Sequence, residues 1–107
     1  MTNGFERVAG LSDLREGDPL GVQTASGEEA VLVKIGSSVY AIAAICTHQE
    51  AWLDMGLVIP ESLELQCPLH EGRFNLQTGE ATALPATDPI KTYPVRIEGN
   101  DILISLG

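Results

Sequence analysis

The sequence predicts an all-β protein built as an antiparallel sandwich, on three observations. Short runs rich in β-branched residues recur along the 107 residues, with Gly, Asn, Asp or Pro between them. No window shows helical periodicity over three turns. Two glycine-containing steps, at 36–38 and 99–100, each separate two such runs in the way that hairpin turns do.

The apolar runs place six outer strands. We expect them over residues 5–9, 20–24, 30–35, 39–42, 91–98 and 101–106. A polar turn region is expected between the first two. In the fifth run, Val95 and Ile97 alternate with Arg96 and Glu98, which is typical of a half-buried strand. Pro94 fits best at an edge or at a strand start, because proline has no N–H to donate to a ladder.

The middle of the chain, residues 44–87, differs from this outer frame. It contains three prolines, several glycines and all of the cysteine and histidine in the chain. We expect it to form a loop-rich insertion into the sandwich. No repeat, low-complexity tract or linker divides the sequence, so residues 1–107 are expected to form a single domain.

The charge of the chain restricts its partners. Fifteen acidic against six basic residues give a formal net charge of −9, which opposes binding to nucleic acid and to anionic membrane surfaces. It suits a partner with a basic docking face, although acidity that serves only solubility remains open. No stretch resembles an export signal or reaches membrane-spanning length, which favours a cytoplasmic protein.

Two short pairs combine a cysteine with a histidine. They are Cys46-Thr47-His48 and Cys67-Pro68-Leu69-His70, and eighteen residues lie between them. A cytosolic setting makes a disulfide improbable, so metal ligation is the better use of both cysteines. Thiolates hold ferric iron tightly, whereas neutral imidazoles leave their iron easier to reduce.

Two alternatives stay open at this point. The cysteines could be small core residues and the histidines surface residues, but chance places four rare residues poorly into two matched pairs. A structural zinc site of the Cys2His2 type would also use these donors. Against zinc, each pair here is mixed, whereas the common zinc finger pairs two cysteines and then two histidines.

These pairs resemble the pattern of the Rieske iron–sulfur family, which is Cys-x-His, a spacer near this length, and Cys-x-x-His. The likeness continues through Gly72-Arg73-Phe74, Thr78-Gly79 and Leu84-Pro85-Ala86 to the closing strand, and so covers nearly the whole chain. It implies a Rieske-type sandwich with a cluster-binding subdomain at about 44–87. It also implies one [2Fe–2S] cluster bound by Cys46, His48, Cys67 and His70.

Departures from parts of that family indicate a low reduction potential. Respiratory and photosynthetic relatives carry two extra cysteines, near Ala51 and at Leu69 here, and donate hydroxyl hydrogen bonds from positions that match Gly72 and Phe74. This chain has none of these groups. Without such donors the potential should fall to about −150 mV, at the bottom of the Rieske range.

That pattern is similar to the Rieske ferredoxins of bacterial aromatic-ring-hydroxylating dioxygenase systems, and less specifically to those of carbazole dioxygenase. The resemblance implies a one-electron carrier, not an enzyme. Its partners would be a NAD(P)H-dependent flavin reductase and a terminal oxygenase, and it would be a monomer. The alternative is an accessory or redox-sensing Rieske subunit, for example of a nitrite-reductase-like complex.

The resemblance also suggests where partners dock. An apolar and acidic rim around the cluster is expected from Glu50, Leu69, Glu71 and Pro85. Glu71, like Gln49, stands where such ferredoxins frequently have glycine after a ligand histidine.

Three other side chains near the cluster have structural expectations. Trp52, the only tryptophan, is expected to pack under the first loop more readily than to contact a partner. Arg73 is expected to pair with Glu71 or another loop carboxylate. Phe74 is expected to pack beneath the second loop.

Overall fold

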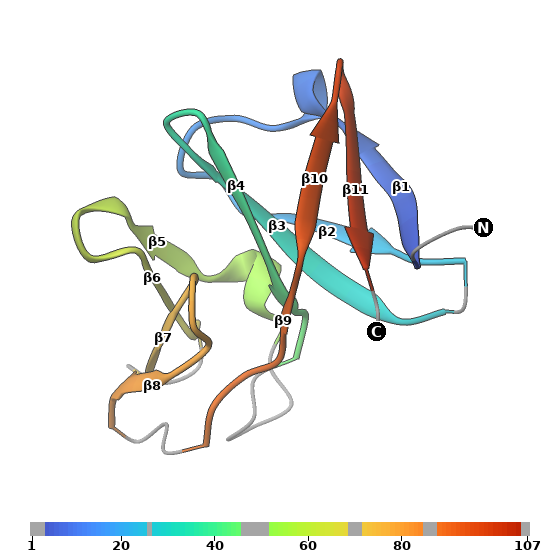
Figure 1. Ribbon diagram of the computed structural model, residues 1–107. Coiled ribbons are helices and arrows are strands. Elements are labelled where there is room, and N and C mark those ends of the chain that lie inside the picture. Colours follow the sequence, from blue (N-terminus) through green and yellow to red (C-terminus); the bar gives the residue numbers. More distant parts are fainter. Residues whose placement is uncertain (1–3, 26, 46–51, 69–71, 85–87, 106–107) are drawn as a thin grey trace.

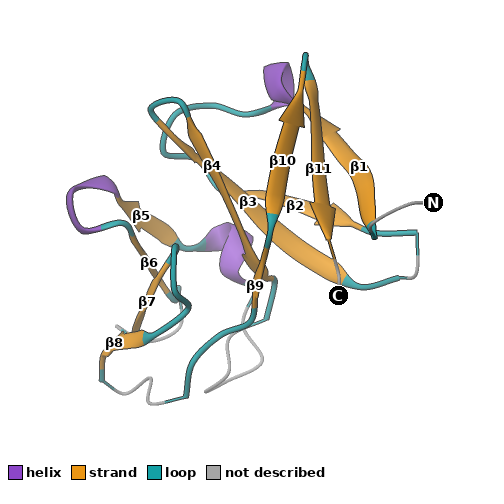
Figure 2. Cartoon of the chain, in the orientation of Figure 1, coloured by secondary structure: helices purple, strands orange, loops and turns teal. Residues whose placement is uncertain are grey.

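The computed structural model is an all-β fold, as predicted, and its strands form three sheets (Figures 1 and 2). It describes residues 4–25, 27–45, 52–68, 72–84 and 88–105. The elements in chain order are β1 (Phe5–Gly10), η1 (Leu11–Asp13), β2 (Leu20–Gln23), β3 (Glu29–Ile35), β4 (Ser38–Ala43), η2 (Leu53–Met55), β5 (Leu57–Ile59), η3 (Pro60–Ser62), β6 (Glu64–Gln66), β7 (Arg73–Asn75), β8 (Ala81–Ala83), β9 (Thr92–Tyr93), β10 (Val95–Glu98) and β11 (Asp101–Ser105).

Two sheets form what we call the basal sandwich. One has the strand order β1-β11-β10 and the other β2-β3-β4-β9, and all their strand pairs are antiparallel. The core between them includes Ala30, Leu32, Ala41, Ile102 and Ile104. The hairpin predicted around residue 36 is confirmed, since Ile35 pairs with Ser38 across a two-residue turn.

The third sheet, which we call the small sheet, has the order β5-β6-β7-β8 and lies beside the basal sandwich (Figure 1). The loop-rich insertion predicted at 44–87 contains this sheet, and the sequence did not predict its strands because each is only three residues long. Val31, Val33 and Ile42 of the basal sandwich pack with Leu65 and Phe74 of the small sheet in a second core.

β3 joins the two cores. Ala30 and Leu32 point into the basal core, whereas Val31 and Val33 point into the core shared with the small sheet. All four are fully buried, so alternate faces of one strand serve different neighbours. This explains why the sequence of β3 is a continuous apolar run instead of an alternating one.

The prediction of one strand over 91–98 is wrong, because these residues form two strands, β9 and β10, in different sheets. Thr92 and Tyr93 pair with β4, whereas Val95 to Glu98 pair with β11. Pro94 stands at the switch, where its carbonyl oxygen accepts a hydrogen bond of 3.1 Å from the backbone N–H of Ser105. Proline supplies no N–H there, which favours a break between ladders.

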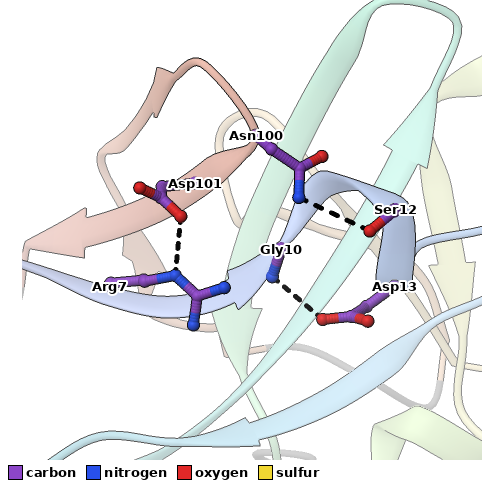
Figure 3. Close-up of polar contacts among 6 residues, drawn as sticks. All are labelled: Arg7, Gly10, Ser12, Asp13, Asn100 and Asp101. Atoms are coloured by element: carbon purple, nitrogen blue, oxygen red, sulfur yellow. Dashed lines mark hydrogen bonds and ion pairs between the residues drawn. The ribbon is translucent and has the colours of Figure 1, made fainter.

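Polar contacts secure the end of the basal sandwich at the β10–β11 turn (Figure 3). Arg7 Nε donates to Asp101 Oδ1 at 2.7 Å, and the backbone N–H of Gly10 donates to Asp13 Oδ2 at 2.9 Å. Asn100 lies in that turn, and its backbone oxygen accepts from Leu11 N at 2.6 Å. Figure 1 shows that this turn points away from the small sheet.

Candidate metal centre

The base of the first Cys/His loop is a closed strand pair. Ile45 and Trp52 form an antiparallel bridge, and Leu53 N donates to Ala44 O at 2.7 Å just outside it. These contacts bracket residues 46–51. The predicted ligands Cys46 and His48, and the predicted docking residue Glu50, lie outside the described residues.

The base of the second loop is the β6–β7 hairpin. Cys67 directly follows β6, and its backbone N–H donates to Gly72 O at 2.9 Å. Gln66 pairs with Arg73 one step further from the loop. The loop is therefore closed around residues 68–71. Of these, Leu69, His70 and Glu71 lie outside the described residues, as does Pro85 of the predicted docking rim.

Both loop bases pack into the same core. Ala44 and Leu53 flank the first loop, Cys67 begins the second, and all three belong to one buried cluster with Leu65 and Phe74. The fold thus brings together two segments that are far apart in sequence. The prediction that Phe74 packs inside is confirmed, because its ring is fully buried.

The position of Cys67 suits a metal ligand. Only 2% of the residue is exposed, and its neighbours in the cluster are mainly aliphatic or aromatic. A thiolate without a bound metal would be a costly charge in such surroundings. Two thiolates with two imidazoles are the donor set of a Rieske cluster, and the residues present fit that group.

Within the described residues, no group of three His, Cys, Asp or Glu side chains is gathered for a metal. This is expected, since three of the four candidate ligands lie outside that part of the chain.

A polar network covers the small sheet. Arg73 Nε donates to Gln66 Oε1 at 3.1 Å, and its NH1 lies 3.8 Å from Glu64 Oε1. A hydrogen bond from Thr82 holds the pKa of Glu64 below its usual range, and a hydrogen bond from Ser62 and the charge of Arg73 act in the same direction. Arg73 therefore pairs with Glu64 of β6, which is not a loop carboxylate, and the predicted partner Glu71 lies outside the described residues.

Two glycines make close approaches that no other residue could make. A Cβ on Gly56 would lie 2.4 Å from the carbonyl oxygen of Gln66. A Cβ on Gly79 would lie 2.1 Å from the carbonyl oxygen of Ile90, and Gly79 also has a φ of +82°. Both contacts fix the small sheet against neighbouring backbone.

A cluster that the sequence reasoning missed joins β9 to the start of β3. The hydroxyl of Tyr93 donates to Glu28 Oε2, and Lys91 Nζ lies 3.4 Å from the same oxygen. The Lys91 ammonium also lies 5.0 Å from the centre of the Tyr93 ring. Hydrogen bonding from Tyr93 lowers the pKa of Glu28, and burial together with Glu28 raises the pKa of Tyr93. Glu28 is separated from Lys91 by 63 positions, so no local pattern could have shown this cluster.

The prediction that Trp52 packs under its loop is wrong, because 48% of the residue is exposed. Ile45, Met55, Leu57 and Leu84 are further apolar residues with large exposed fractions. Exposed apolar side chains therefore lie at the base of the first loop, at Ile45 and Trp52, and at the outer strands of the small sheet, at Leu57 and directly after β8 at Leu84. Among the described residues, no helix is long and apolar enough to cross a membrane.

Comparisons with known proteins agree with this site. A family model, the Rieske [2Fe-2S] domain, matches residues 5–94. The ferredoxin component of a naphthalene 1,2-dioxygenase system from Pseudomonas putida is 43% identical over 99% of both chains. In structure, the ferredoxin of carbazole 1,9a-dioxygenase from Nocardioides aromaticivorans IC177 has a TM-score of 0.89 and 46% identity, and the match covers 96% of this chain and 98% of that one.

A second similar structure comes from a complex of reduced oxygenase and oxidized ferredoxin in carbazole 1,9a-dioxygenase. Its TM-score is 0.87 at 25% identity, over 97% of this chain and 94% of that chain. The relatives are named as ferredoxin components, which carry electrons for another protein's catalysis. This chain belongs to the Rieske [2Fe–2S] family, and it is a ferredoxin with one such cluster.

Proposed function

We propose that Cys46, His48, Cys67 and His70 hold the cluster, and that the chain carries single electrons from a NAD(P)H-dependent flavin reductase to a terminal oxygenase. The burial of Cys67 at the base of a hydrogen-bonded hairpin supports this most directly. When bound, the cluster supplies a one-electron couple. The two loop bases share one core, which would bring the four donors together, and the apolar lining excludes water from the Cys67 sulfur.

The likeness to ferredoxin components of naphthalene and carbazole dioxygenase systems supports the choice of partners. The net charge of −9 supports docking on basic faces, since complementary charge speeds encounter without tight binding. We propose that the rim residues Glu50, Leu69, Glu71 and Pro85 take part in that docking. The chain would act as a cytosolic monomer that diffuses between its partners.

We propose a reduction potential of about −150 mV, at the low end of the Rieske range. Gly72 and Phe74 stand where high-potential relatives donate hydroxyl hydrogen bonds, and neither has a hydroxyl. A redox titration of the purified protein measures this directly. A potential near that of respiratory Rieske proteins, well above 0 mV, would contradict it.

Reconstitution tests the function. The purified holoprotein is mixed with NADH and with the flavin reductase and terminal oxygenase of its own host, and oxygen uptake with an aromatic substrate is followed. We expect uptake to require all three proteins and to rise with the concentration of this chain. Uptake that is equally fast without the chain would contradict the proposal.

A further inference from the structure

A small hollow of about 250 Å³ lies beside Trp52. Ala30 and Ala44, both buried, form its floor, and the exposed side chains of Glu29, Trp52 and Asp54 form its rim. The carboxylate of Asp54 lies over Gly21, since Oδ2 is 3.1 Å from the position that a Gly21 Cβ would take. Because Ala30 and Ala44 have small side chains, the space between the rim residues is left unfilled.

The rim is negatively charged, and its two carboxylates have no partner among the described residues. Neighbouring Glu28 is already held by Tyr93 and Lys91. Within the described part of the chain, the side chains of Glu29 and Asp54 have no hydrogen-bond or ion-pair partner, and the residues lining the hollow include no cation. Two carboxylates therefore stand free next to a half-exposed indole.

This combination selects a cationic side chain. A guanidinium or ammonium group is attracted to the face of an indole and forms strong hydrogen bonds with carboxylates. The volume lies below the range of about 300–1,000 Å³ that is usual for small-molecule sites, and so fits the end of one side chain better than a free ligand. A second copy of this chain is a poor occupant, because two molecules each with a charge of −9 repel one another.

The hollow is also tied to the first cluster loop. Trp52 pairs with Ile45 in the bridge that closes residues 46–51, which contain Cys46 and His48. A group bound against Trp52 is therefore anchored at the base of that loop. We propose that the Trp52 hollow receives a lysine or arginine side chain from the docking face of the protein that exchanges electrons with this chain. This inference rests on the proposed carrier function.

A peptide probe tests the chemistry of the hollow. Trp52 is the only tryptophan, so the tryptophan emission of the holoprotein, excited selectively over tyrosine, reports on this site alone. Acetyl-triarginine amide should change the emission in a saturable way, and acetyl-tricitrulline amide, which keeps the shape but lacks the charge, should not. The Glu29→Gln/Asp54→Asn variant should weaken the response about tenfold at low salt.

A matched control removes the same charge elsewhere. Glu61→Gln/Glu98→Gln changes two exposed carboxylates that do not line the hollow, and should bind the peptide as the unchanged protein does. Trp52→Leu cannot be followed by fluorescence, so its effect is measured in electron transfer. Loss of the aromatic face should slow transfer about two- to fivefold.

Electron transfer then separates the two proposals. Reduction by the reductase and oxidation by the oxygenase are followed at several salt concentrations. We expect the Glu29→Gln/Asp54→Asn variant to be slower with at least one partner, with a weaker salt dependence than the unchanged protein. If the unchanged protein transfers electrons while this variant matches it in rate and in peptide binding, the docking inference is overturned and the carrier function stands. If the unchanged protein transfers no electrons, the carrier function fails, and the docking inference fails with it.

Discussion

The basal sandwich and the small sheet are stabilised in different ways. In the basal sandwich, long strands such as β3 lie over a core that includes fully buried Leu32, Ile102 and Ile104. The small sheet has strands of three residues, and it buries one face through Leu65 and Phe74. Such short strands give few ladder hydrogen bonds. From this difference we expect the basal sandwich to be stable without the metal, whereas the small sheet should depend on its tight glycine contacts and on the bound metal.

Removal of a proposed ligand should give the largest difference in stability between the small sheet and the basal sandwich. We expect Cys67→Ser to lose the iron and sulfide, and the small sheet to lose protection in amide hydrogen exchange while the basal sandwich keeps it. Ala9→Ser is the control, because it puts a hydroxyl into the basal core, far from the loops in sequence. Full iron and sulfide content in Cys67→Ser would remove Cys67 from the ligand set.

The next largest effect is expected from the close contact that Gly79 makes with the backbone of Ile90. Gly79→Ala should lower the free energy of unfolding by about 3 kcal/mol, because it combines a left-handed backbone with a clash against Ile90 O. Gly36→Ala isolates the backbone cost, since Gly36 has a φ of +62° with no atom within 4 Å of the position that a Cβ would take, and should cost about 1–2 kcal/mol. Urea unfolding measures both. Equal losses would show that the contact with Ile90 is not tight.

The cluster around Glu28 ties β9 to the start of β3 within one sheet of the basal sandwich. Tyr93→Phe removes the hydroxyl that donates to Glu28 and keeps the ring under Lys91. We expect the midpoint of thermal unfolding to fall by a few degrees, while the iron–sulfur cluster stays bound. A variant that lost its iron would contradict a purely structural role for Tyr93.

The smallest expected effect on the free energy of unfolding comes from removing the charge of Glu64 on the small sheet. Its pKa is lowered in the folded state, so its charged form stabilises the fold above the unfolded pKa of about 4.5, and this stabilisation is lost as pH falls through the lower folded pKa. Glu64→Gln should cost about 0.5 kcal/mol at pH 7. The difference from the unchanged protein should shrink below pH 4 in denaturant titrations. A constant difference down to pH 3 would mean that hydrogen bonding, not charge, is responsible.

Most of the basal sandwich could be predicted from the sequence, because long apolar runs and glycine turns specify it locally. The strands of the small sheet could not, since three residues are too few to show a period. The sequence indicates that Pro94 fits an edge or a strand start, but the switch between sheets depends on which partner the residues on each side of Pro94 pair with.

The site was predicted from residue types and their spacing. Four rare residues in two mixed pairs predict a donor set, and of these four the structure describes Cys67, which is buried where both loop bases meet. The hollow beside Trp52 could not have been found in this way. It depends on Glu29, which is distant in sequence, and on alanines that leave space unfilled.

Low-temperature EPR of the dithionite-reduced protein, with iron, sulfide and zinc assayed on the same sample, decides whether this chain carries electrons on a Rieske cluster. We expect two irons and two sulfides per chain, and the rhombic signal of a reduced cluster with mixed cysteine and histidine ligands. His48→Cys or His70→Cys should abolish that signal. A silent, colourless sample that contains zinc without sulfide would contradict electron transfer by this chain.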